Sequence, residues 1–225
     1  MPFRRPLRAQ AAVAVALVTL VTGCAGRRAS LTTASPPAAG GDAGTPVGDG
    51  AVDTVLGDLE RPMASSFTAT YAITRKLGAT AGTALVSRGP LATSVTVGDV
   101  RFVRSDADHT CVLSTKACED TINDARISDL GIASSFWRDA PARVLRVTYG
   151  RRASPASGDT VTIAGQSAQC VSVPVGTGAE RYCALPAGAM ARWDTAYITI
   201  ELTAWEPNVR QESFELPIAA KADGS

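Results

Sequence analysis

Two segments far apart in the chain alternate between apolar and polar residues, and this alternation constrains the fold more than any other feature. In residues 67–74, Phe67, Ala69, Tyr71 and Ile73 are separated mostly by threonine. Near the other end, one face of residues 196–205 would carry Ala196, Ile198, Ile200, Leu202 and Ala204. Period-two alternation is typical of half-buried antiparallel strands. With further strands predicted at 91–97 and 100–103, joined by a turn at Val97–Val100, the pattern predicts a meandering sheet.

Two other segments carry apolar residues at helical spacing. Residues 51–60 place Val52, Val55, Leu56 and Leu59 on one side, which predicts a short amphipathic helix. Residues 134–149 bring Phe136, Ala140, Val144 and Val147 to one side, with Pro141 at a helix start and Gly150 as a stop. These one or two short helices need the sheet to cover their apolar face, so the fold class predicted is α+β.

The first 23 residues have the composition of an export signal. Arg4, Arg5 and Arg8 precede an apolar run at 11–21, which is too short to span a bilayer. The next residues, Val21-Thr22-Gly23-Cys24, resemble the lipobox of bacterial lipoproteins. That resemblance implies that Cys24 carries a diacylglycerol and anchors the chain to the outer face of the cell membrane. The alternative is an ordinary signal peptide with a chance cysteine at its cleavage site.

The segment from the predicted lipidated Cys24 to Gly50 is expected to be a flexible tether. Twenty of the twenty-six residues from 25 to 50 are Gly, Ala, Ser, Thr or Pro. Such a composition buries too little apolar surface to offset its ordering entropy. Residues 51–225 are then predicted to form a single domain, which suits a chain of 225 residues.

Four cysteines remain after Cys24: Cys111, Cys118, Cys170 and Cys183. An even number in an exported domain indicates disulfides, of which three pairings are formally possible. We favour Cys111–Cys118 and Cys170–Cys183 because each pair flanks a probable turn between short strands. A zinc site is the alternative, but Cys111 and Cys118 lack the usual close spacing of zinc ligands.

Composition and motifs argue against several functions. The formal charge of +1, without long basic blocks, disfavours nucleic acid as a partner. His109 is the only histidine, and we expect it in a polar hairpin loop rather than in a metal or catalytic site. Serine-hydrolase, penicillin-binding and phosphate-loop motifs are absent from the sequence. We therefore expect no enzyme activity, no metal and no cofactor.

The C-terminal half resembles the LolA/LprG-like lipoproteins of actinobacterial envelopes. The resemblance rests on Thr162-Ile163-Ala164-Gly165, the strand Ala168–Val173, the turn Arg181–Gly188 and the ending Phe214-Glu215-Leu216-Pro217, and it extends over residues 65–217. It implies a strongly curved antiparallel sheet, a half-open barrel, with helices covering its concave face. Some members of the family carry acylated lipids in the hollow.

Two functions follow from this fold, and the state of the concave face separates them. Many expected inward positions are alanine, which favours a hollow that binds or shuttles an acyl-chain ligand, lipid or glycolipid. The candidate lining residues are Ala69, Tyr71, Phe136, Val144, Ile198 and Ile200. The alternative is an envelope interaction or regulatory module of the same fold with a filled core and an unknown protein partner. Trp137, Trp193 and Trp205 suit either a ligand site or the core.

Overall fold

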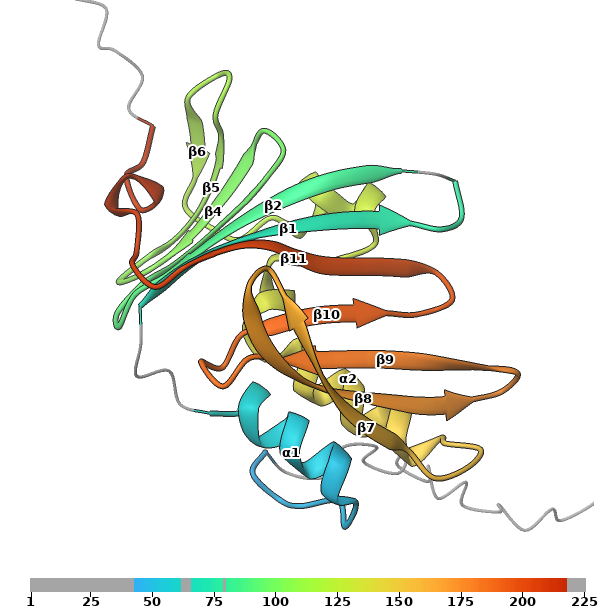
Figure 1. Ribbon diagram of the computed structural model, residues 1–225. Helices are drawn as coiled ribbons and strands as arrows, with labels where there is room; N and C mark the ends of the chain where they lie inside the picture. The colour runs from blue at the N-terminus through green and yellow to red at the C-terminus, as the bar shows by residue number, and fades with distance from the viewer. Residues whose placement is uncertain (1–42, 62–65, 79, 218–225) are drawn as a thin grey trace, which may run out of the picture. The chain divides into compact units, whose positions relative to one another are not determined.

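Eleven antiparallel strands form one open sheet in the computed structural model, which describes residues 43–61, 66–78 and 80–217 (Figure 1). The strands are β1 (Phe67–Arg75), β2 (Ala81–Arg88), β3 (Thr93–Val97), β4 (Val100–Arg104), β5 (Asp108–Val112), β6 (Ala117–Glu119), β7 (Ser157–Ile163), β8 (Gln166–Val175), β9 (Gly178–Ala184), β10 (Met190–Asp194) and β11 (Ile198–Glu206). The helical segments are α1 (Gly50–Leu59), α2 (Ala140–Gly150) and the 3₁₀ segments η1 (Asp124–Leu130), η2 (Ser134–Trp137) and η3 (Gln211–Ser213).

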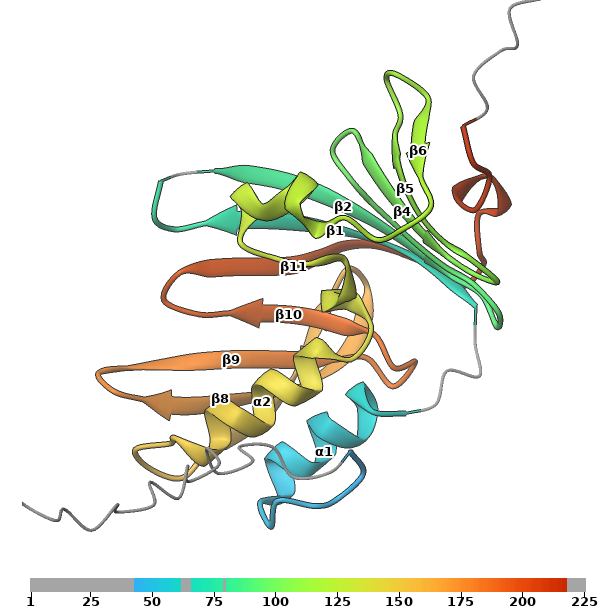
Figure 2. The same ribbon diagram turned by 180° about the vertical axis from the view of Figure 1, so that it is seen from behind.

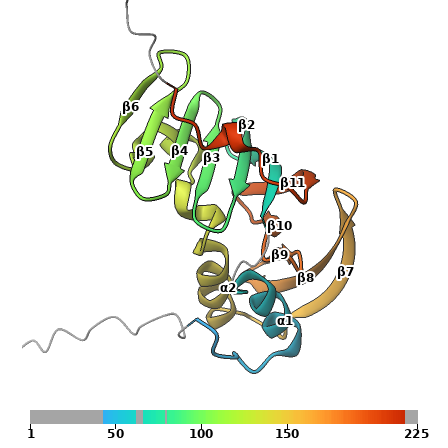
Figure 3. The same cartoon turned by 90° about the vertical axis from the view of Figure 1, so that its left-hand side faces the viewer.

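The sheet consists of two meanders joined in its middle. Its order is β6-β5-β4-β3-β2-β1-β11-β10-β9-β8-β7, so β1 pairs with β11 and the two edge strands are β6 and β7. Because β6 and β7 are consecutive in the chain but lie at opposite edges, their connection must cross the sheet. It does so as η1, η2 and α2, which lie over one face (Figure 2). The sheet curves around these helices (Figure 3), which confirms the predicted α+β class.

The alternation predicted for the central strands is present, with one correction. Phe67, Ala69, Tyr71 and Ile73 of β1 are all buried. On β11, Ile198, Ile200 and Leu202 are buried, but Ala196 lies exposed in the preceding turn and Ala204 is exposed. A register shift between Thr70 and Tyr71 explains why Ala204 is exposed, because an extra residue of β11 reverses the faces beyond it. Trp205, not Ala204, therefore shares a face with its partner Ala69.

Helix α1 confirms the prediction for residues 51–60. Asp49 caps it by accepting hydrogen bonds from the backbone N–H groups of Ala51 and Val52. The predicted apolar residues are buried, and the helix packs on β7, β8, β9 and α2. The folded part begins earlier than Ala51, because Gly44, Val47 and Gly48 donate backbone hydrogen bonds to carboxylates of α1 and its C-cap.

Helix α2 buries a different side from the one predicted. Its buried stripe is centred on Leu145, with Ala142 and Tyr149 one turn to either side, whereas Val144 and Val147 are only half-buried. The helix contacts η2, α1 and β8, and Arg146 and Thr148 bond to partners outside α2, so its orientation is decided by several neighbours. Pro141 lies in the first turn as predicted, but Gly150 is the last helical residue and not a stop beyond it.

Candidate functional site

Four aromatic side chains fill the space between the central strands and η2, and we call them the aromatic plug: Tyr71, Phe136, Trp137 and Trp193. The ring of Phe136 lies 5.0 Å from that of Trp193 and 5.4 Å from that of Trp137, centroid to centroid. The ring of Tyr71 lies 5.8 Å from that of Trp137. The Tyr71 hydroxyl donates to the carbonyl of Met190 at 3.0 Å, and burial raises the pKa of this phenol. Segment η2 thus brings two large rings onto the concave face.

The residues predicted to line a cavity are buried or half-buried in the structure. The exposed fractions of Ala69 and Ile200 are 0%, and that of Tyr71 is 1%. Phe136 and Ile198 are also buried in the same apolar cluster, and Val144 packs against it from the half-buried side of α2. A side chain that borders an empty acyl-chain cavity keeps surface that a water-sized sphere can touch. The central positions Ala69, Tyr71 and Ile200 have almost no such surface.

A small slot lies at the edge of the aromatic plug, between η2 and strands β3 and β4. Its volume is about 10 Å³, which is room for about one water molecule. Val95, Phe102 and Trp137 form apolar walls. The Ser134 hydroxyl and the Trp137 indole N–H are buried and have no hydrogen-bond partner among the described residues. Two polar atoms in this mostly apolar setting are thus buried without a protein partner among the described residues.

A larger, open groove of about 450 Å³ adjoins the slot, and we call it the rim groove. It is lined by Arg88, Gly89, Pro90, Leu91, Ala92, Thr93, Arg104, Ser105, Asp108 and Arg138. The strand register explains how its cations meet: Thr93 of β3 pairs with Arg88 of β2 on one side and with Arg104 of β4 on the other. Arg138, directly after η2, completes the groove from the helical layer.

The three arginines of the rim groove differ in their partners. Arg104 pairs with Asp108 at 3.4 Å, and Arg138 approaches Asp139 at 3.7 Å. Arg88 has no carboxylate partner among the described residues and makes one long hydrogen bond, at 3.5 Å, to the carbonyl of Trp137. Burial, and then the charge of Arg138, lower the pKa of Arg88, and Asp139 opposes this effect. A guanidinium stays protonated at neutral pH, so Arg88 is a cation in the groove without an ion pair to any described residue.

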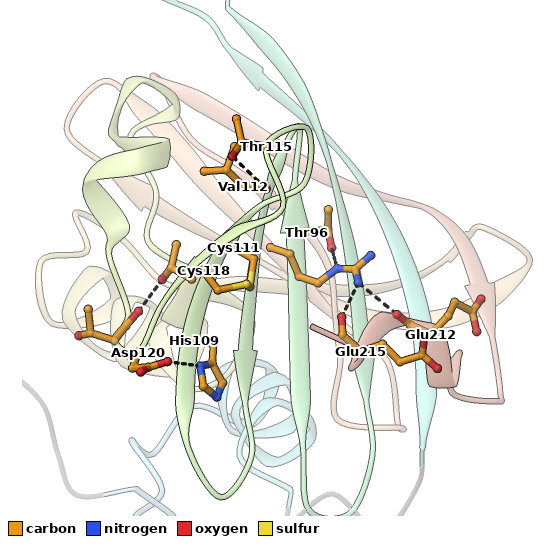
Figure 4. Close-up of a disulfide and its surroundings, with 12 residues drawn as sticks. Thr96, His109, Cys111, Val112, Thr115, Cys118, Asp120, Glu212 and Glu215 are labelled. Atoms are coloured by element: carbon orange, nitrogen blue, oxygen red, sulfur yellow. Dashed lines mark hydrogen bonds and ion pairs between the residues drawn. A yellow bond between two sulfur atoms is a disulfide. The ribbon is translucent and has the colours of Figure 1, made fainter. Parts of the chain in front are cut away.

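The structure forms both predicted disulfides. Cys111 bonds to Cys118 across β5 and β6 (Figure 4), and Cys170 bonds to Cys183 across β8 and β9. In each case the two cysteines lie directly opposite one another in neighbouring strands. The first bridge links the edge strand β6 to β5. Because β6 has only three residues and few hydrogen bonds to hold it, this covalent link stabilises its place in the sheet.

His109 lies in β5, not in the hairpin loop expected for it. One ring nitrogen, Nδ1, lies 3.0 Å from a carboxylate oxygen of the exposed Asp120 (Figure 4). In the part of the chain that the structure describes, no three His, Cys, Asp or Glu side chains group as metal ligands. Over the same ranges, no helix has both the length and the apolar character needed to cross a membrane. Cys24 lies outside the described residues.

Sequence reasoning recognised several parts of this site but missed the rim groove. The strands at 91–97 and 100–103 were predicted, but β2 was not, and Arg88, Arg104 and Arg138 are too widely spaced to stand out as a basic motif. A register prediction for the β2–β3–β4 meander could have found Arg88 and Arg104, because hairpin register follows from turn length. Arg138 reaches the groove only through the crossing connection.

Comparisons with known proteins found similarity only among solved structures. No family model and no curated protein matches the chain. The chain is similar to the MucA/MucB complex of Pseudomonas aeruginosa, with 14% identity and a TM-score of 0.47 over 73% of this chain and 60% of that one. MucB in complex with MucA(peri) is 13% identical, with a TM-score of 0.47 over 75% of this chain and 60% of that one. MucB alone is 12% identical, with a TM-score of 0.44 over 77% of this chain and 64% of that one. This chain thus covers less than two thirds of each MucB chain, and we infer its function from its own residues.

Proposed function

We propose that this chain is a membrane-anchored lipoprotein of the LolA/LprG-like type, on the extracytoplasmic face of the cell membrane, that acts as a non-enzymatic binding module through its surface. Burial of the central residues of the concave face supports an interaction module with a filled core over a carrier that encloses an acyl chain. The observation behind it is the near-zero exposure of Ala69, Tyr71 and Ile200 beneath the aromatic plug. Enclosing a lipid would require η2 to leave the sheet and take Phe136 and Trp137 with it.

Membrane attachment is expected to depend on Cys24, because only its thiol can accept the diacylglycerol. Replacing Cys24 by Ala in the full-length chain should prevent lipidation and release the protein from the membrane fraction. Fractionation of cells, with mass spectrometry of the N-terminal peptide, measures this. Ser30→Ala, which keeps the thiol, is the matched control. An unmodified peptide in the parent protein would contradict the anchor.

A filled core makes a specific prediction at Ala69. This side chain is fully buried and lies directly between Val86 of β2 and Trp205 of β11. Ala69→Trp should therefore overpack the core and lower the free energy of unfolding by about 1–3 kcal/mol or more. The measurement is thermal unfolding, together with mass spectrometry of lipid extracted from the parent protein.

The matched control for this experiment is Ala72→Trp on the same strand. Ala72 lies on the other face of β1 and is half-exposed, so a large ring there should change stability little. Stoichiometric lipid in the parent protein, displaced by Ala69→Trp without loss of stability, would support the carrier instead. No extracted lipid, with destabilisation by Ala69→Trp alone, supports the filled core.

A further inference from the structure

The rim groove combines a cationic floor with an apolar lip. Arg88, Arg104 and Arg138 lie within it, while its outer wall is the turn that carries Leu91. The exposed fraction of Leu91 is 89%, the highest among the large apolar side chains of the described residues. A leucine held in water next to guanidinium groups is the arrangement found at the interface of a membrane, where apolar tips enter the acyl boundary and arginines meet phosphates.

The lack of a partner for Arg88 points to an external anion. The other deeply placed arginine, Arg146, is matched by Glu60 with two hydrogen bonds of 2.8 and 2.7 Å. Arg88 is half-buried, repelled by Arg138, and bonded only to a carbonyl at 3.5 Å. Withdrawing a guanidinium from water is costly when no anion compensates it. An anion in the open groove would supply the missing partner.

We propose that the rim groove binds the phosphate of anionic phospholipid headgroups at a bilayer surface, with Leu91 inserted beside it. This inference rests on the proposed function, because it takes the open rim of the sheet, and not an enclosed hollow of the concave face, as the binding surface. Guanidinium groups bind phosphate through paired hydrogen bonds, and the three arginines supply several such donors.

The shape of the groove and its exposed leucine favour a lipid surface over an acidic peptide. An extended peptide needs a line of side-chain pockets or a strand edge, whereas the groove is one shallow, open depression of about 450 Å³. Leu91 projects into solvent and forms no pocket for a peptide side chain. A bilayer satisfies both features at once, since its phosphates lie just above its apolar region.

The test uses the chain from Ala25 onward, which lacks Cys24 and so carries no acyl anchor. All described structure lies between residues 43 and 217, in a unit that excludes residues 1–35, so this chain retains it. Co-sedimentation is measured with vesicles of phosphatidylcholine alone and of equal parts phosphatidylcholine and phosphatidylglycerol. We expect binding to the mixed vesicles only. Arg88→Gln and Arg138→Gln should each weaken it about five-fold, as expected for one arginine at an anionic surface.

Matched controls separate the groove from general charge and from misfolding. Arg151→Gln removes the same charge from an exposed position outside the groove and should leave binding unchanged. Arg88→Lys should weaken binding less than Arg88→Gln, because it keeps the charge but loses the paired hydrogen bonds of the guanidinium. Leu91→Ser should weaken vesicle binding, whereas Leu77→Ser, at another exposed turn, should not.

Several results would overturn the inference. These are absence of binding to the mixed vesicles, equal losses for Arg151→Gln and Arg88→Gln, or binding of oligoglutamate or of soluble glycerol 3-phosphate without vesicle binding. Lipid extraction before the vesicles are added keeps the two proposals apart. Enclosed lipid in that extract would defeat the filled core, whereas the groove variants test only the headgroup site.

Discussion

Replacing Arg146 by Met is expected to lower the free energy of unfolding by about 3 kcal/mol or more, because it strands a buried carboxylate. The side chains of Arg146 and Glu60 are only 5% and 14% exposed, and the two join α2 to the end of α1. Arg146 also donates to the carbonyl of Thr45 at 2.6 Å, which holds the residues before α1. Chemical denaturation of the parent and the variant measures the loss.

Two comparison variants isolate the cause. Arg210→Met removes the exposed ion pair with Glu206 and should change the free energy of unfolding much less than Arg146→Met does. A double variant, Arg146→Met with Glu60→Leu, removes both buried charges and should recover much of the stability. If Arg146→Met costs no more than Arg210→Met, the pair does not stabilise the helical layer.

The same pair predicts a dependence of stability on pH. Burial alone would raise the pKa of Glu60, but hydrogen bonds from Arg146 and Gly44, with the charge of Arg146, outweigh burial and lower it from the usual 4.5. The unfolded chain therefore binds a proton more readily than the folded one as the pH falls below 4.5. The contribution of Glu60 is present above that pH and is lost as the pH falls through the folded-state pKa. Glu60→Gln should reduce this acid sensitivity.

Phe136→Ala is expected to destabilise the protein by about 3–5 kcal/mol, since it removes a ring from the middle of the aromatic plug. Phe136 is buried and contacts both Trp137 and Trp193, so truncation leaves a void that the neighbouring rings can fill only partly. Thermal unfolding followed by near-ultraviolet circular dichroism reports both the stability and the packing of the two tryptophans.

The matched control is Leu91→Ala, a truncation of an exposed side chain that should change stability by less than about 0.5 kcal/mol. A loss of less than 1 kcal/mol for Phe136→Ala would show that the ring is not held in a packed core. That result would reopen the carrier hypothesis, because a loosely held η2 is what a lipid would need to displace.

Several elements of this fold could be predicted from the sequence because their signals are local. The alternation of β1 and the Val97–Val100 turn depend on backbone geometry over a few residues, and α1 follows from helical spacing with Asp49 as its cap. The cysteine pairing is of the same kind, since each bridge closes a short hairpin. The lipobox at Cys24 stays a prediction.

Other features depend on contacts between residues distant in sequence. The extra residue in β11 turns Ala204 outward only because β1 sets the register beside it. Helix α2 has apolar residues on more than one side, and packing against α1, η2 and β8 decides that Leu145 is fully buried while Val144 is only half-buried.

Local sequence patterns could not predict what packs on the concave face, because this too depends on contacts between residues distant in sequence. Small residues on the strands indicated a hollow, yet whether a hollow exists depends on which side chains the crossing connection brings in. That connection runs from one sheet edge to the other and delivers Phe136 and Trp137 to the centre, with Arg138 beside Arg88 at the rim. The sequence by itself determined the strands, the first helix and the hairpin bridges, because backbone periodicity acts over a few residues. Only the tertiary structure decided that Phe136 and Trp137 pack against the sheet and that Arg138 joins Arg88 in an open groove, because both arise where separate segments meet.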